Sequence, residues 1–389
     1  MRTASSVGAL VIFLASVAKL FEALCARRLV RPLPEKDSAG SSLELPKLSV
    51  VIPARNEERK LEGALRTVLG QDYPHLEAIL VNDRSTDGTG RTMEHLTAGR
   101  GDATVIQVEE LPEGWLGKNN AIHVGTERAS GDWLLFTDGD IHFHPAAFRR
   151  AIAYAEERSL DHLTLVPELK LSGYWLRGVV AFFYTAFLVH RGYYKANIPS
   201  SEMGVGIGAF NLIRREAYDE AGGYKALAQR PDDDLALGGR VKKLGLRQEL
   251  ALGHGLLEVE WYASLGEFFC GVEKNSFAAL GYSVPKVVFY AAEIPALTAW
   301  PFAAAFLASG ATAALYAGSV AAQVATFAVC NRFLRGRVFL LALGYPACAL
   351  LFSYALLRSA LLALARGGIY WRGTFYPLSL LKEKRRERV

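Results

Sequence analysis

Long apolar segments near both ends of the chain limit the folds that are open to it. Residues 5–24 form an apolar run of about 20 residues, long enough to cross a bilayer as a helix. Three further apolar runs, at residues 287–308, 311–330 and 338–357, are candidate spans. The sequence therefore predicts a folded domain, at residues 47–254, with membrane segments on either side.

Positive charge supports this division and indicates an orientation. The net charge is +5, and much of the excess lies beside apolar segments rather than in one stripe that would bind nucleic acid. Arg27, Arg28 and Arg31 follow the first apolar run. A cleaved signal peptide carries its charge before the run, so we expect a retained anchor whose carboxyl end is cytoplasmic.

The carboxyl-terminal spans leave two alternatives open. Arg332, Arg335 and Arg337 separate the last two candidates and indicate a cytoplasmic loop. A further full span would place the basic tail outside, against the positive-inside tendency. Either residues 338–365 form a re-entrant hairpin, or one candidate is not a full span. The aromatic-rich residues 255–285 are expected to lie along the membrane surface.

Strands that alternate with helices characterise the middle of the chain. Residues 48–53, 76–81 and 103–108 are predicted strands, and residues 119–129 are a predicted helix. Asn56 is expected to cap the helix after the first strand. This alternation predicts an α/β fold with a largely parallel sheet that is covered on both faces.

Two carboxylates follow the next strand directly. In Asp132-Trp-Leu-Leu-Phe-Thr-Asp-Gly-Asp140 a short buried strand leads to Asp138 and Asp140, with Gly139 between them. Open α/β sheets bind ligands at the carboxyl ends of their strands. Two hard oxygen donors there suit a divalent cation that takes its other ligands from water and substrate phosphates. A D-x-D pair is common by chance, so the neighbouring motifs decide whether this pair indicates a binding site.

Four other polar stretches share that context. They are Pro53-Ala-Arg-Asn-Glu57, Asn82-Asp-Arg-Ser-Thr-Asp87, Gly114-Trp-Leu-Gly-Lys118 and Pro231-Asp-Asp-Asp-Leu235. Each one alone is explained equally well as a solvated loop with capping acids. All five stretches in this order after strands indicate a binding site at one edge of the sheet.

These motifs resemble the inverting glycosyltransferases of family 2, over about residues 48–245. The resemblance implies a GT-A nucleotide-diphospho-sugar transferase fold, Rossmann-like, with a mostly parallel sheet and transmembrane helices at both ends. Within the family, the Gly-Trp-x-Gly-Lys stretch and the apolar tail resemble the hopanoid-associated glycosyltransferases, which are membrane-bound and non-processive.

The resemblance also implies roles for residues that match the family pattern. Pro53, Ala54 and Glu57 match the start of the nucleotide-binding region. Asp83 matches the acid that reads the base, since a carboxylate accepts N–H groups of uracil or guanine. Lys118 is expected to meet the diphosphate as a point charge.

A divalent cofactor, Mg²⁺ or Mn²⁺, is implied with them. Asp138 is expected to face the ribose or a metal-bound water, and Asp140 the metal itself. His254 is a candidate third ligand, with a loop histidine as the alternative. Gly208, in a glycine-containing strand on the acceptor side, is expected to border the sugar.

The catalytic base must be chosen among three consecutive aspartates. The family has Glu-Asp, then Leu three, Arg six and Gly eleven residues beyond the Asp. Leu237, Arg240 and Gly245 fit this spacing if Asp234 is the base, and Asp233 then replaces the family Glu. Starting from the first aspartate leaves the Arg and Gly out of place.

The implied reaction moves a sugar from a UDP- or GDP-sugar to a lipid or lipid-linked acceptor by one displacement, at the cytoplasmic face of the inner membrane. Processive members carry Gln-x-x-Arg-Trp after the base, and this chain does not. A synthase of short glycans remains an alternative, and so does a non-enzymatic membrane scaffold. A nucleotidyltransferase would show a Gly-rich, Arg-containing loop after the first strand instead.

The expected organisation has six parts. They are an anchor (1–30), a linker (31–46), a catalytic domain (47–254), an interfacial region (255–285), a transmembrane region (286–366) and a basic cytoplasmic tail (367–389).

Overall fold

The computed structural model describes residues 2–34, 45–331, 338–371, 374–379 and 381. The chain divides into two compact units. The sheet unit comprises Val30–Lys170 and Lys195–Glu260, and the helical unit comprises Met1–Leu29, Leu171–Tyr194 and Trp261–Val389.

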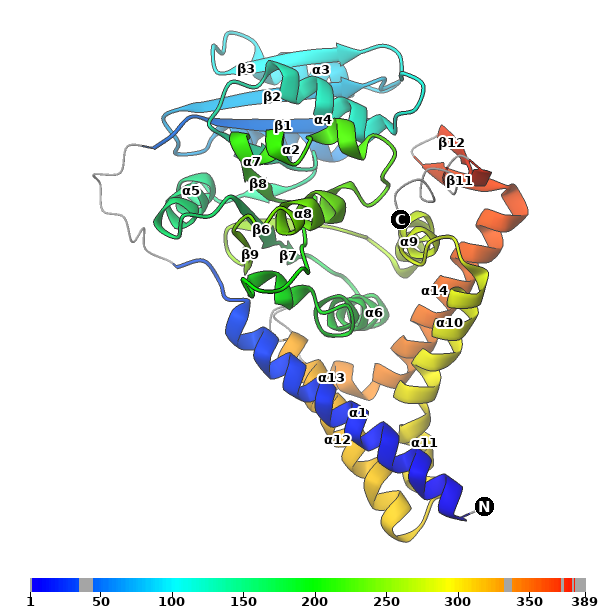
Figure 1. Cartoon of the computed structure of the whole chain (residues 1–389). Coiled ribbons are helices and arrows are strands. Elements are labelled where there is room, and N and C mark those ends of the chain that lie inside the picture. The colour runs from blue at the N-terminus through cyan, green and yellow to red at the C-terminus, as the bar shows by residue number, and fades with distance from the viewer. Residues whose placement is uncertain (1, 35–44, 332–337, 372–373, 380, 382–389) are drawn as a thin grey trace. The chain divides into compact units, whose positions relative to one another are not determined.

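A seven-stranded sheet, in the order β3-β2-β1-β4-β8-β6-β9, forms the centre of the sheet unit (Figure 1). Its strands are β1 Leu48–Ala54, β2 Leu76–Asp83, β3 Ala103–Val108, β4 Trp133–Phe136, β6 His162–Val166, β8 Asn211–Arg214 and β9 Gln248–Leu252. Only β8 runs antiparallel to its neighbours. The predicted α/β class with a mostly parallel sheet is confirmed, and β1 to β4 end at one common edge.

Helices and a small second sheet complete this unit. The helices are α2 Glu58–Leu69, α3 Thr89–Thr97, α4 Gly117–Arg128, α5 Ala147–Glu157, α7 Arg215–Glu220 and α8 Asp233–Lys243, with a 3₁₀ turn η3 at Tyr224–Leu227. The small sheet pairs β5 His142–Phe143, β10 Leu257–Val259 and β7 Glu168–Leu169. A further 3₁₀ turn, η2, covers Tyr193–Asn197.

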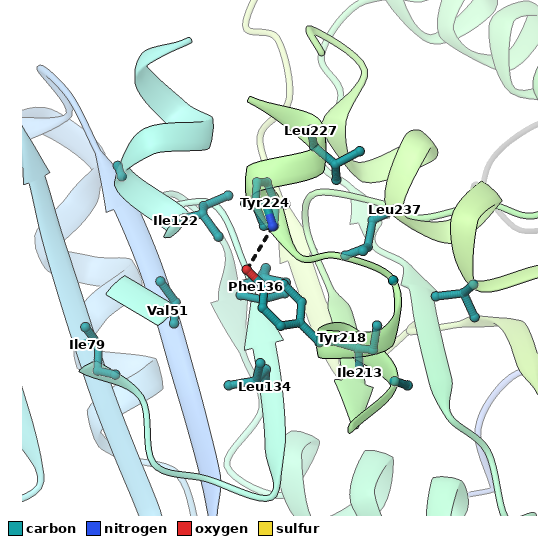
Figure 2. Packing of buried hydrophobic residues seen from close by; sticks show 14 of the residues in the cluster. Val51, Ile79, Ile122, Leu134, Phe136, Ile213, Tyr218, Tyr224, Leu227 and Leu237 are labelled. Atoms are coloured by element: carbon teal, nitrogen blue, oxygen red, sulfur yellow. Dashed lines mark hydrogen bonds between the residues drawn. The ribbon is translucent and has the colours of Figure 1, made fainter. Parts of the chain in front are cut away.

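One apolar cluster joins the sheet to the elements that carry the predicted site (Figure 2). Val51, Leu134 and Phe136 on the strands pack against Ile122 of α4 and Leu237 of α8. All five are almost completely buried, and an aliphatic or aromatic side chain that is fully buried contributes roughly 1.5–3 kcal/mol. The cluster therefore fixes α4 and α8 against the same face of the sheet.

Helix α2, which follows β1, does not begin as expected. Asn56 was predicted as its cap, but Glu57 occupies that position, without a side-chain capping bond. Asn56 Oδ1 instead accepts a hydrogen bond from Thr86 N at 2.8 Å, and Asn56 N donates to Ser85 Oγ at 3.1 Å. The side chain thus connects the loops after β1 and β2, because both loops leave the sheet at the same edge.

The helical unit contains the apolar segments. Its elements are α1 Arg2–Leu29, α6 Tyr174–Thr185, the π-helical η1 Ala186–His190, α9 Leu265–Ala279, α10 Val284–Thr298, α11 Trp300–Leu307, α12 Gly310–Asn331, α13 Val338–Leu343, α14 Tyr345–Arg366, and the hairpin of β11 Gly368–Trp371 and β12 Thr374–Pro377. By length and composition Ser6–Leu29, Gly310–Asn331 and Tyr345–Arg366 are able to cross a membrane. α10 and α11 qualify together, as a pair bent by 41°.

Polar contacts align three of these segments. Ser6 Oγ lies 2.8 Å from Thr312 Oγ1, so α1 and α12 start side by side. Further along, Gln323 Nε2 donates to Ser16 Oγ at 3.2 Å and to Leu297 O at 2.8 Å, beside the break between α10 and α11. The helices α1 and α12 are therefore parallel, and the break lies level with their middle turns.

Candidate active site

The end of β4 places the first carboxylate of the predicted site. Thr137 follows the strand, and its Oγ1 donates to Ala209 O at 2.8 Å, which holds the turn against the segment before β8. Asp138 comes next, and its Oδ1 accepts a hydrogen bond from Lys118 Nζ at 2.6 Å. Lys118 is the second residue of α4, so the ion pair joins the helix to the strand end.

Gly208 is the point on which the predicted residues converge. A Cβ atom added to it would lie 3.1 Å from Asp138 Oδ2, 3.2 Å from Lys118 Nζ and 3.4 Å from Asp234 Oδ2. Its own N–H donates to Asp234 Oδ2 at 2.8 Å. Three residues predicted from separate motifs thus lie around this one glycine, within the sheet unit.

The three consecutive aspartates have three different environments. Asp232 forms an ion pair with Arg230 at 2.7 Å, with both side chains more than a third exposed. Asp233 is buried, and its Oδ2 accepts a hydrogen bond from Tyr224 OH at 3.0 Å. Asp234 alone of the three accepts the bond from Gly208. This geometry favours Asp234 as the acid that faces the site around Gly208, with Asp233 behind it.

Burial changes the acid–base properties of this group. The pKa of Asp234 is raised to about 7, first by burial and then by the neighbouring Asp233, although Lys118 opposes the shift. Burial alone would lower the pKa of Lys118, but Asp138, Asp233 and Asp234 together raise it above its ordinary value. A carboxylate with a pKa near neutral is suited to accept a proton at the pH of a cell.

The helix that carries Asp234 is held by direct backbone contact. A Cβ on Gly206 would collide with the carbonyl oxygen of Asp234, and a Cβ on Gly238 would collide with the carbonyl of Val205. Glycine is required at both positions because only glycine allows two backbones to approach this closely. The segment before β8 and α8 therefore form one rigid support for Asp234 and Gly208.

The predicted base-reading acid lies at the end of β2. Asp83 is buried, and two guanidinium nitrogens of Arg84 donate hydrogen bonds to its carboxylate, Nε to Oδ1 at 2.7 Å and Nη2 to Oδ2 at 3.1 Å. Arg84 has a φ of 54°, a conformation that costs energy for a residue other than glycine. A Cβ on Gly117 would lie 2.5 Å from Asp83 Oδ2, which places the start of α4 against this pair.

The remaining residues of the predicted nucleotide region line the adjacent loops. Pro53 and Ala54 end β1, beside β4, where Val51 is paired with Phe136. The backbone N–H of Glu57 donates to Thr89 Oγ1 at 2.8 Å. The sequence analysis missed Arg84, although its position directly after Asp83 was a usable signal.

A divalent cation would have an incomplete set of protein ligands here. Asp138 and Asp140 lie two residues apart in the turn after β4 and are both partly exposed. Among the described residues no group of three or more His, Cys, Asp and Glu side chains is arranged to hold a metal ion. His254 is therefore not gathered with the two aspartates, and its role stays a prediction. Two carboxylates still fit a cation that completes its shell with phosphate oxygens.

Comparisons with known proteins agree with this geometry. Residues 49–222 match the model of the family "Glycosyl transferase family 2". These residues are a family 2 glycosyltransferase domain. The match begins within β1 and ends after α7, so it contains the β4 turn, Lys118 and Gly208, and it stops before Asp234.

Curated relatives of this chain include 4,4'-diaponeurosporenoate glycosyltransferases of Staphylococcus aureus, strains USA300 and NCTC 8325. Each is 26% identical over 247 residues, which cover 62% of this chain. The chain spans 64% of the length of these relatives.

A mannosyltransferase from Pyrobaculum calidifontis, solved in complex with GDP-Man and Mn²⁺, is similar in structure to this chain. The TM-score is 0.51 at 15% identity, over 92% of this chain and 99% of the other. This likeness agrees with the predicted GT-A fold and extends beyond residues 49–222.

Proposed function

We propose that this protein is an inverting glycosyltransferase that moves a sugar from a nucleoside-diphosphate donor to a lipid or lipid-linked acceptor. The observation that carries the proposal is the convergence of Lys118, Asp138 and Asp234 around Gly208. This arrangement combines a cationic group for a leaving diphosphate with a proton-accepting carboxylate, which are the two functions that a single displacement requires.

On the donor side, β1, β2 and α4 provide the binding groups. Asp83, oriented by Arg84, would accept an N–H of the base at the end of β2. Lys118 would bind the diphosphate with its ammonium group, which Asp138 holds in place at 2.6 Å. A divalent cation bound at Asp138 and Asp140 would offset the negative charge that develops on the departing diphosphate.

On the acceptor side, Asp234 would take the proton of the attacking hydroxyl. Its Oδ2 is fixed by the Gly208 N–H at 2.8 Å, and its Oδ1 accepts from Leu235 N at 2.8 Å. Both bonds leave a lone pair on each oxygen, so the carboxylate is oriented and still able to accept a proton. Attack opposite to the leaving diphosphate inverts the anomeric carbon.

Two observations support a lipid-like acceptor at a membrane. Within the residues that the structure describes, the helical unit has three helices long and apolar enough to span a bilayer. Its α1 ends in Arg27 and Arg28, which favours a cytoplasmic position for that end. The Staphylococcus relatives are named for transfer to a carotenoid acid. The P. calidifontis neighbour contains GDP-Man and Mn²⁺, which supports a metal-dependent sugar donor here.

One assay tests the whole proposal. Membranes that contain the protein are incubated with a panel of radiolabelled UDP- and GDP-sugars and Mg²⁺ or Mn²⁺, and the products are extracted into organic solvent. We expect label in the organic phase with one donor, and none with Asp234→Asn or without metal. Label only in high-mass aqueous material would indicate the short-glycan synthase, and no transfer from any donor would indicate the scaffold.

A further inference from the structure

Asn119 joins the two halves of the candidate site. It follows Lys118 in α4 and is fully buried. Its amide Nδ2 donates to Leu227 O at 2.6 Å and to Arg230 O at 2.9 Å. Both acceptors belong to the turn that leads from η3 into α8, the helix of Asp234.

Two backbone bonds complete this connection. Leu116 N donates to Ala228 O at 2.8 Å, and within the turn Arg230 N donates to Leu227 O at 2.8 Å. Three hydrogen bonds therefore fix residues 227–230 against the start of α4, and a fourth closes the turn itself. Residues 231 and 232 alone separate this fixed turn from the start of α8.

We propose that Asn119 is a positioning residue that sets the distance between the diphosphate-binding Lys118 and the base Asp234. The inference rests on the proposed function for its catalytic meaning. These two charged side chains lie on different helices, Lys118 on α4 and Asp234 on α8. The turn held by Asn119 is the covalent start of α8, so its position decides where Asp234 lies along the attack direction.

The choice of asparagine follows from the donors that are needed. Two carbonyl oxygens face one nitrogen, and a side-chain amide supplies two N–H groups from a single atom. An ionised aspartate of the same shape accepts hydrogen bonds but donates none, so it would face two carbonyls with like partial charge. Asn119→Asp therefore removes the two hydrogen-bond donors while it preserves the shape of the side chain.

The next residue provides a matched control. Asn120 is 3% exposed, and in the part of the chain that the structure describes no hydrogen bond runs from its side chain to the turn. Asn120→Ala thus removes the same kind of buried side chain from the same helix as Asn119→Ala does, but it breaks no hydrogen bond to residues 227–230.

The test compares wild type, Asn119→Ala, Asn119→Asp and Asn120→Ala in full-length protein. A base displaced by about 1 Å slows a reaction on the order of 100-fold, so we expect Asn119→Ala to lower kcat on the order of tenfold to 100-fold. Binding of UDP or GDP with Mn²⁺, measured by calorimetry, should stay close to wild type because Lys118 and Asp83 are retained. Asn120→Ala should keep kcat near wild type.

A second measurement does not depend on activity. Amide hydrogen exchange of residues 227–236 should rise in Asn119→Ala and not in Asn120→Ala, since only the first loses the two bonds. Unchanged exchange, a wild-type kcat in Asn119→Asp, or an equal loss of nucleotide affinity and kcat would each overturn the positioning role. A wild type that transfers no sugar would sink the proposed function, while the exchange result would still decide whether Asn119 holds the turn.

Discussion

Replacing Asp234 by Asn should stabilise the protein while it abolishes transfer. The pKa of this carboxyl is raised from 3.8 to about 7 by burial and by Asp233. The folded state therefore binds the Asp234 proton more tightly than the unfolded state does. The stability that this bound proton contributes is fully present below about pH 4, the pKa of the carboxyl in the unfolded state. It is lost progressively as the pH rises through about 7, the pKa in the folded state.

The size of the effect follows from this shift. Three pKa units correspond to about 4 kcal/mol at 1.36 kcal/mol per unit, which is an upper bound for a group that also interacts with Lys118. Asn has one acceptor oxygen where the carboxylate binds two N–H groups, of Gly208 and Leu235, and losing one bond costs roughly 1–3 kcal/mol. We therefore expect a net gain of about 1–3 kcal/mol above pH 7.

The assay is thermal unfolding of the purified protein at several pH values, followed by intrinsic fluorescence. The gain of Asp234→Asn over wild type should be absent near pH 4 and should reach a few degrees in Tm at pH 8. Asp232→Asn is the matched control, because an exposed ion pair contributes at most about 1 kcal/mol. An Asp234→Asn variant that is no more stable than wild type at pH 8, or equally stabilised at both pH values, would refute the reasoning.

Three further predictions test other parts of the structure. Gly208→Ala should lower kcat/KM at least on the order of tenfold, because the new methyl group would lie against Asp138, Lys118 and Asp234. Gly239→Ala is the control and should retain activity, because a methyl group there would meet no atom within 4 Å. Equal effects of the two substitutions would contradict the crowding argument. The kcat/KM should fall about tenfold per pH unit below an apparent pKa near 7, since Asp234 must be ionised; a flat profile from pH 5 to 8 would exclude it as the base. Cysteines introduced at Thr374 and near the end of α1 should be labelled from the same side of the membrane. The end of α14 lies beside α9, where Arg366 binds Glu273, and α10 and α11 lead from α9 to the start of α12, which lies beside the start of α1. Labelling from opposite sides would contradict the alternative in which residues 338–365 are re-entrant.

Local patterns were enough to predict the strands and the position of the acids. Apolar runs that end in Asp83 and Asp138 are visible in the sequence, and a parallel sheet brings such ends to one edge. The spacing to Leu237 and Arg240 also favours Asp234 among the three consecutive aspartates. These inferences depended on residues close together in the chain.

The structure adds what depends on distant contacts. Tyr224 donates a hydrogen bond to Asp233, and Asn119 donates to a residue more than 100 positions away. No local sequence pattern predicts these two contacts. The incorrect cap at Asn56 has the same origin: its side chain found Thr86 on a neighbouring loop rather than the helix that follows. Hydrogen bonds between separate loops form only after the sheet has assembled, which is why sequence reasoning does not reach them.

The glycines beneath α8 have a consequence for how such an enzyme can change its substrates. Because Gly206 and Gly238 let main chain rest on main chain, the contact between α8 and the segment before β8 does not depend on side chains packed between them. Residues on the acceptor side that do not hold this contact or the turn bound by Asn119 can therefore change during evolution, or in engineering, while the proton acceptor remains where it is.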